Sequence, residues 1–242
     1  MKFGALFIAL AAFAPSLASA KAVEIKRESK ALEFSYSWSA EAADIPSLDA
    51  RFKAEADKAF KEAMANAKDD QRLAKEQKRD FNGHFLAMKW TTAGQTPRLL
   101  SLESDFGSFT GGAHPNSSYG ALLWDRQLQA QVPLANLFAR PTDLGALTKT
   151  TYCKKLDAER LKKREGEKLT GEFAKCPDFK ELAIAPADTN KNGKFDHLIF
   201  TASPYVAGPY VEGEYEISLP VTAKMVAALK PDYRTSFEPQ RQ

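Results

Sequence analysis

The sequence has little cysteine, little histidine and, after its first residues, no long hydrophobic run. A membrane-spanning helix needs about 20 consecutive apolar residues, so we expect no transmembrane segment in the mature chain. Lysine plus arginine number 34 and aspartate plus glutamate number 31, which gives a formal net charge of +3. This near balance argues against nucleic acid as a partner and against strong attraction to a membrane surface.

Residues 1–20 are typical of a removable secretory signal peptide. Lys2 supplies a positive charge, residues 4–13 are apolar, and Ala18-Ser19-Ala20 is a small-residue cleavage pattern. A retained N-terminal anchor is the alternative, but the apolar run is too short to span a bilayer. We therefore expect a periplasmic or secreted protein whose mature chain begins at residue 21.

The only two cysteines are Cys153 and Cys176. Both lie in the part expected to reach an oxidising compartment, where a disulfide is the simplest interpretation. A metal site or a reactive thiol is the alternative, although the chain has no CxxC motif and no histidine near either residue. In the chain-entropy model, a disulfide closing this loop would stabilise the fold by roughly 3 kcal/mol.

The periodicity of apolar residues indicates both strands and helices. Aromatic and polar residues alternate over residues 32–38, which is typical of a half-buried strand. After Ser47, which we interpret as a helix N-cap, apolar residues recur every three or four positions and predict a long amphipathic helix. Further strands are expected at 85–91, 97–106, 119–125, 182–184, 197–202 and 210–219, with helices at 142–163 and 221–229.

This irregular mixture predicts an α+β fold, mostly antiparallel sheet packed with one long and several shorter helices. We expect one body that can be divided into two lobes. Residues 21–110 would form an N-terminal strand-helix-strand lobe. Residues 111–242 would form a C-terminal α+β lobe that contains the disulfide.

The most distinctive motif is a loop with two glycines and a histidine. Gly111 and Gly112 permit backbone angles closed to other residues, and His114 can donate, accept or titrate near neutral pH. Together with Asn116, these residues form a candidate recognition or acid-base site. The alternative is a tight loop in which His114 hydrogen-bonds the local backbone.

A hydrolase centred on His114 would need a nucleophile and an orienting carboxylate beside the ring. Ser108, Ser117 and Asp105 are near in sequence, but no G-x-S-x-G elbow occurs and the chain has only three histidines. We therefore assign no catalytic residue.

A second motif places oxygen-bearing side chains at alternating positions before a glycine, at Asp188, Asn190, Asn192 and Asp196. This pattern is similar to the first half of an EF-hand loop, so calcium is the one cofactor the sequence suggests. Ile199 stands where the bidentate glutamate should be, and two lysines in the loop oppose a cation. The alternative is a simple Asn-Gly turn that leads into the next strand.

A third motif contains three tyrosines among prolines and glycines, from Tyr205 through Tyr210 to Tyr215. Tyrosine offers a large, rigid contact area with a polar end, which suits both protein and glycan surfaces. The same residues could equally form the rim of a core.

Two of these segments carry a resemblance: Gly111-Gly112-Ala113-His114, and Pro204-Tyr205 with Gly208-Pro209-Tyr210 leading to residues 215–220. Over roughly Leu32 to Phe237 the chain resembles the domains of unknown function found in the lysozyme-sensing anti-sigma factor RsiV and beside the catalytic domain of the peptidoglycan deacetylase PdaC. The resemblance implies an α+β envelope domain that, in one relative, binds lysozyme. The sequence shows neither a cytoplasmic segment nor a separate deacetylase domain, so neither activity is carried over.

We therefore expect an exported cell-envelope binding protein for a protein such as lysozyme or for cell-wall glycan. The loop from Gly111 to Asn116 and the segment from Tyr205 to Tyr215 are its expected contact surfaces. An envelope hydrolase and a calcium-stabilised structural protein are the alternatives.

Overall fold

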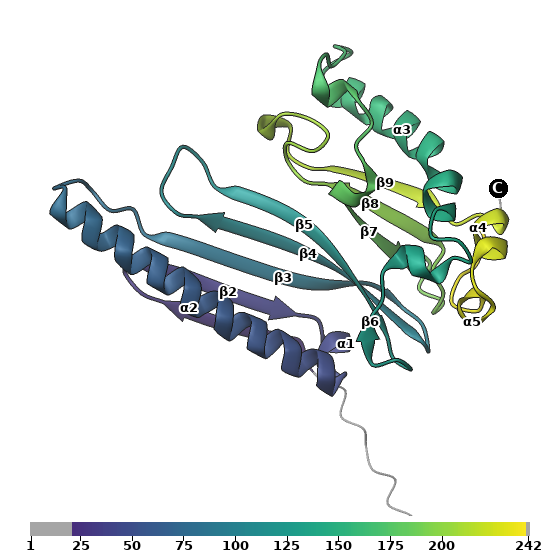
Figure 1. Cartoon of the computed structure of the whole chain (residues 1–242), viewed down its shortest axis with the longest axis horizontal. Coiled ribbons are helices and arrows are strands. Elements are labelled where there is room, and N and C mark those ends of the chain that lie inside the picture. The colour runs from purple at the N-terminus through teal and green to yellow at the C-terminus, as the bar shows by residue number, and fades with distance from the viewer. Residues whose placement is uncertain (1–20, 241–242) are drawn as a thin grey trace, which may run out of the picture.

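The structure is a computed structural model that describes residues 21–240, so the predicted signal peptide lies outside the described residues. Its first sheet has six strands that follow one another in space as they do in sequence (Figure 1). All neighbours are antiparallel except β2 and β3, which are parallel because helix α2 crosses between them. The strands are β1 (Val23–Glu28), β2 (Leu32–Trp38), β3 (His84–Gln95), β4 (Leu99–Phe109), β5 (Asn116–Asp125) and β6 (Ala130–Gln131).

Helix α2 (Pro46–Glu76) covers one face of this sheet, and the four-residue helix α1 (Ala40–Ala43) precedes it (Figure 1). The aromatic residues of β2 turn toward α2, and Phe52 of the helix stacks on Trp90 with 5.3 Å between ring centroids. The alternation seen in the sequence therefore buries one face of β2 and leaves the other face partly exposed.

The second sheet contains β7 (Leu182–Ala187), β8 (His197–Ala202) and β9 (Tyr215–Pro220), all antiparallel. Helix α3 (Asp143–Lys163) covers one face of it, with α4 (Ala223–Ala228) and α5 (Pro231–Arg234) at one end. Four short 3-10 helices complete the fold: η1 (Leu134–Leu137), η2 (Glu172–Ala174), η3 (Phe179–Glu181) and η4 (Tyr210–Glu212).

The predicted disulfide between Cys153 and Cys176 is present. It joins α3 to the charged excursion that follows the helix. Arg160, which is 3% exposed, also holds this excursion: its guanidinium donates to the carbonyl of Lys175 at 3.0 Å and to that of Ala207 at 2.9 Å.

A buried carboxylate joins the two halves of the molecule. Asp125, at the end of β5, accepts hydrogen bonds from Arg98 Nε at 2.9 Å and from the Tyr233 hydroxyl of α5 at 3.1 Å. The N–H groups of Gln127 and Leu128 bind its other oxygen. Burial acts to raise the pKa of Asp125, but these hydrogen bonds outweigh it and hold that pKa below its ordinary value.

The predicted α+β class is confirmed. Two local expectations are wrong. The N-cap of α2 is Ile45 rather than Ser47, because Pro46 occupies the first turn of the helix. The strand expected from residue 210 begins at Tyr215, after η4. The hairpin of β4 and β5 crosses the lobe boundary expected at residue 110, since both strands belong to the first sheet. Within residues 21–240, no helix combines the length and apolar character needed to cross a membrane.

Replacing Asp125 by alanine is expected to lower the free energy of unfolding by about 3–5 kcal/mol at neutral pH, because Arg98 and two backbone donors lose their partner. Since the folded-state pKa is depressed, the parent should hold this stability above the ordinary carboxylate pKa and lose it as the pH falls through the folded value. Denaturant unfolding of both proteins across pH measures it.

The matched control is Asp232→Asn. Its carboxylate lies 3.8 Å from Arg98 Nη1 and its side chain is 76% exposed, so the loss should stay below about 1 kcal/mol. Equal losses for the two variants would contradict the role given to Asp125.

Candidate functional site

The two segments singled out in the sequence meet in space, at the tips of the β4–β5 loop and the β8–β9 loop. The ring of His114 stacks on Tyr210 with 3.9 Å between centroids, and the Tyr205 ring lies 5.6 Å from that of Tyr210. The Tyr210 hydroxyl donates to the carbonyl of Pro115 at 2.6 Å. We call His114, Tyr205 and Tyr210 the aromatic cluster.

Local hydrogen bonds shape the loop that carries the two tyrosines. The Tyr205 N–H donates to the carbonyl of Gly208, and the Val206 N–H to that of Ser203. The Ser203 hydroxyl accepts a hydrogen bond from the Tyr119 N–H of β5 at 3.0 Å, which ties this loop to the first sheet. The cluster is therefore anchored on both of its loops.

Tyr205 combines exposure with backbone strain. Its side chain is 56% exposed, and its φ of 71° lies in the left-handed region that a bulky residue rarely adopts. Such strain costs about 1–3 kcal/mol and gathers at functional sites. The strained, exposed ring makes Tyr205 a candidate for a functional role.

The groups that hydrogen-bond the His114 ring do not form a catalytic triad. Its Nδ1 lies 2.7 Å from the Pro115 carbonyl, which can only accept, so Nδ1 carries a proton. Its Nε2 lies 3.4 Å from the Tyr205 hydroxyl. Among the described residues, no serine hydroxyl or carboxylate hydrogen-bonds this ring.

The rest of the histidine loop has different roles. Gly111 adopts a φ of 79°, which requires glycine, whereas a Cβ at Gly111 or Gly112 would meet nothing within 4 Å. The two glycines therefore leave the loop surface open rather than close-packed. Asn116 begins β5 and pairs in register with Ser108, outside the aromatic cluster.

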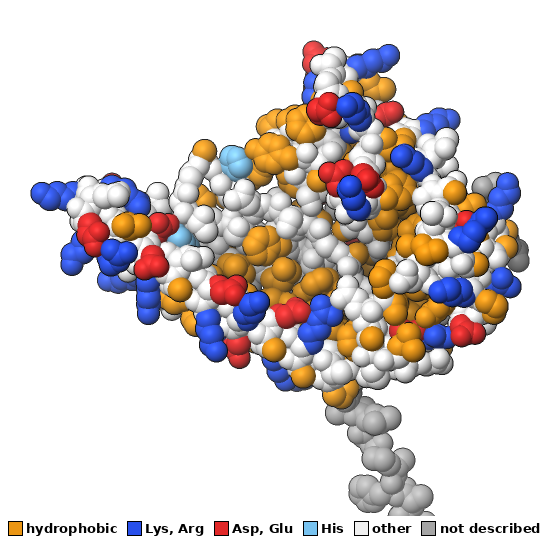
Figure 2. All heavy atoms as spheres, in the orientation of Figure 1, with side chains coloured by type: hydrophobic (Ala, Val, Ile, Leu, Met, Phe, Trp, Pro, Cys, Tyr) orange, Lys and Arg blue, Asp and Glu red, His pale blue; other side chains and the backbone are white. Residues whose placement is uncertain are grey.

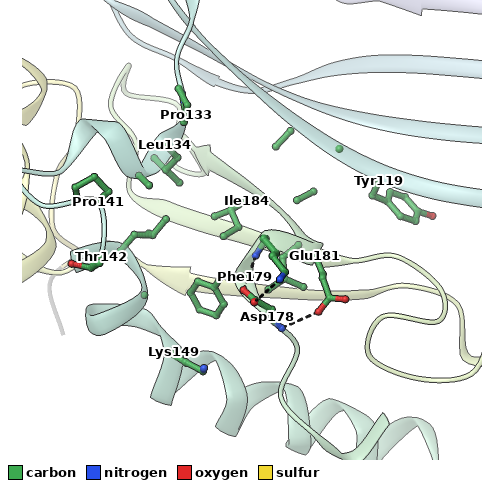
Figure 3. Close-up of a pocket in the computed structure, with 18 residues that line it drawn as sticks. Tyr119, Pro133, Leu134, Pro141, Thr142, Lys149, Asp178, Phe179, Glu181 and Ile184 are labelled. Carbon is green, nitrogen blue, oxygen red and sulfur yellow. Dashed lines mark hydrogen bonds and ion pairs between the residues drawn. The ribbon is translucent and has the colours of Figure 1, made fainter. Parts of the chain in front are cut away.

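A separate cleft of roughly 730 Å³ opens between β5, α3 and β7. Figure 3 shows Leu134, Phe179 and Ile184 around it, from η1, η3 and β7. Asp178 and Glu181 at its edge are bound to each other's backbone as a capping box of η3. In the space-filling view the surface is hollowed between the two sheets, with hydrophobic side chains on the floor (Figure 2). The residues that line the cleft come from distant segments of the chain, so no single sequence motif predicts it.

In the loop over residues 188–196, which suggested calcium, the side-chain oxygens accept hydrogen bonds from backbone N–H groups. Asp188 accepts from the N–H groups of Asn192 and Gly193, at 3.1 and 2.8 Å. Asp196 is fully buried and accepts from the Thr189 N–H at 2.8 Å and the Thr189 hydroxyl at 2.7 Å. The amide nitrogens of Asn190 and Asn192 both donate to Glu238.

These hydrogen bonds account for the conformation of the loop without a bound cation. The part of the chain that the structure describes holds no group of three or more His, Cys, Asp or Glu placed to bind a metal. Binding of calcium through Asp188, Asn190, Asn192 and Asp196 stays a prediction.

The N-terminal part of the chain, residues 25–117, matches the family model described as Deacetylase PdaC. Residues 25–117 are therefore similar to a PdaC-type domain. The match runs from β1 to the first residues of β5 and includes the loop that carries His114. The resemblance drawn from the sequence is confirmed.

Two solved structures share the fold over nearly the whole chain. A DUF3298 family protein from Pseudomonas aeruginosa PAO1 is 17% identical with a TM-score of 0.56, covering 92% of this chain and 98% of its own. A DUF3298 family member from Bacteroides fragilis NCTC 9343 is 15% identical with a TM-score of 0.55, covering 89% and 96%. At these identities the likeness concerns the fold. No curated protein matches the chain in sequence.

The strain at Tyr205 predicts different stabilities for two truncations of the same ring. Both Tyr205→Ala and Tyr205→Gly remove the side chain, but only glycine adopts a φ of 71° without penalty. We expect the glycine variant to be more stable than the alanine variant by about 1 kcal/mol in denaturant unfolding. An alanine variant that is equally or more stable would contradict the strain.

Proposed function

We propose that this chain is an exported binding protein of the cell envelope that recognises a protein, such as lysozyme, or cell-wall glycan through its aromatic cluster. The observation that carries the proposal is the meeting of His114, Tyr205 and Tyr210 on two loops that are far apart in sequence. Three ring side chains grouped at the surface offer contact area together with hydroxyl and imidazole hydrogen-bonding groups.

The anchoring of the cluster supports a binding role. A partner that meets side chains already held in place loses less conformational entropy than one that must order them. The bond between Tyr210 and Pro115 and the strained turn at Tyr205 both favour such preorganisation. Val211, which follows Tyr210, is 89% exposed and extends the apolar surface on the same loop.

Export is part of this proposal. The pattern of residues 1–20 is that of a cleaved leader, and a disulfide persists where the compartment is oxidising. The resemblance to the RsiV domain supports lysozyme as the first partner to test. Muropeptides are the second, because a PdaC-type domain fits a protein that works near the cell wall.

The proposal predicts binding that depends on the aromatic cluster. In calorimetric titration of the chain from residue 21 onward with lysozyme and with purified muropeptides, at least one titrant should give a saturable heat signal. Tyr205→Ala and Tyr210→Ala should each weaken that binding at least tenfold, since aromatic residues at the centre of an interface contribute about 2 kcal/mol or more.

Leu128→Ala is the matched control, because Leu128 is also an exposed apolar side chain, 57% exposed, but lies between β5 and β6. It should bind like the parent. Heat from neither titrant, or equal weakening by the control, would overturn the proposed site.

Export predicts a defined mature N-terminus. Mass spectrometry of the protein from the periplasmic or culture fraction should find a chain that begins at Lys21 and has no free thiol. A protein recovered from the cytosol with its leader intact and both cysteines reduced would contradict the proposed location.

A further inference from the structure

A small pocket lies between the two sheets, and the charged side chains that line it are all carboxylates. Its volume is roughly 170 Å³. Glu103 and Asp105 come from β4, Glu216 comes from β9, and Glu214 immediately precedes β9; no lysine, arginine or histidine lines the pocket. We call this the acidic pocket.

The alternation of the strands aims these side chains at one another. Tyr215 and Ile217 of β9 are buried in the core beneath α3, so Glu214 and Glu216 on the opposite face turn toward the first sheet. Thr201 is the register partner of Glu216 on β8 and shares its face. The pocket is therefore built by five strands from two sheets, β3, β4 and β5 of the first and β8 and β9 of the second.

The hydroxyl of Thr201 opens into the acidic pocket. Thr201 is only 6% exposed and lines the acidic pocket. Its hydroxyl forms no side-chain hydrogen bond with a described residue, and it is not one of the enclosed polar atoms that lack a partner, so it is open to the pocket. A polar atom left free inside a pocket is a ready contact for a bound group.

The carboxylates lack a cationic partner, although the Tyr119 hydroxyl hydrogen-bonds Glu214. None of the four forms an ion pair with a described residue, and Lys89, the register partner of Asp105 on β3, does not reach one. Burial and the charge of Glu216 raise the pKa of Glu103. Burial, with Glu214 and Asp105, raises the pKa of Tyr119 on the pocket wall to about 12. The pocket is therefore a site of negative potential, in which Glu103 is half-buried and Asp105, Glu214 and Glu216 are exposed to solvent.

We propose that the acidic pocket binds one basic side chain, the ammonium of a lysine or the guanidinium of an arginine, presented by a protein partner. Charge complementarity carries the choice of a cation. The described carboxylates are not grouped to hold a metal ion. The volume equals about six waters at ~30 Å³ each, so the pocket suits the end of a long side chain better than a sugar ring.

This inference goes beyond the proposed function and rests on different residues. It holds whether or not the aromatic cluster binds a partner. The guanidinium and ammonium groups supply five and three donors respectively, which can meet the carboxylates and the Thr201 hydroxyl together.

The test is titration of the chain from residue 21 onward with Nα-acetyl-lysine amide and Nα-acetyl-arginine amide, followed by NMR of the backbone amides. Nα-acetyl-norleucine amide is the neutral match. At least one cationic probe should saturate with shifts at Glu103, Thr201 and Glu216, and the binding should weaken at high salt. The neutral probe should cause no saturable shift there.

The double variant Glu103→Gln, Glu216→Gln should bind the cationic probe at least tenfold more weakly, and Thr201→Val should also weaken it. Glu62→Gln, Glu76→Gln makes the same charge change on the exposed face of α2 and should bind like the parent. If this control weakened binding of the cationic probe equally, the effect would come from overall charge, and the proposal would be overturned.

Two further readouts keep the test decisive. The pocket double variant should melt no lower than the parent at neutral pH, because it relieves repulsion between carboxylates; a lower melting temperature would contradict the crowding. Glucosamine carries an ammonium on a ring, so tighter binding of glucosamine than of either side-chain probe would overturn the assignment to a protein side chain.

Discussion

The buried carboxylate of Asp125 is the interaction on which the relation of the two sheets depends. It binds Arg98, which immediately precedes β4, and Tyr233 of α5, so α5 is fastened to the first sheet. Arg98 also lies over the Tyr233 ring, 4.2 Å from its centroid. With the far ends of the sheets held here, the tips of the β4–β5 and β8–β9 loops meet at the opposite end of the long hairpin (Figure 1).

That arrangement explains why both candidate sites lie between the two sheets. The aromatic cluster forms where the two loops touch, and the acidic pocket forms where the polar faces of β4 and β9 approach one another. Tyr119 links them, because its N–H binds Ser203 beside the cluster while the residue itself lines the pocket. Each site nevertheless rests on its own residues.

Much of the fold could be predicted from the sequence because its signals are local. Alternation over residues 32–38, the apolar stripe of α2 and the two cysteines each specify their own surroundings. Strand β1 escaped prediction because its residues alternate only between partly and fully exposed, with no aromatic face. The residues His114, Tyr205 and Tyr210 were identified singly as candidates, but their contact depends on the packing of two sheets. The acidic pocket has no signal at all in sequence, since its four carboxylates come in two pairs about 110 residues apart, within strands that are otherwise ordinary.

The central claim is that two distant loops form one ordered recognition surface. Two-dimensional NMR of the free protein tests it most directly, because the ring centroids of His114 and Tyr210 lie 3.9 Å apart. The account predicts nuclear Overhauser cross-peaks between the protons of these two rings, and a change in both ring signals when the partner is added. Rings that show no cross-peaks in the free protein, or signals that stay unchanged at saturation with a partner, would contradict it.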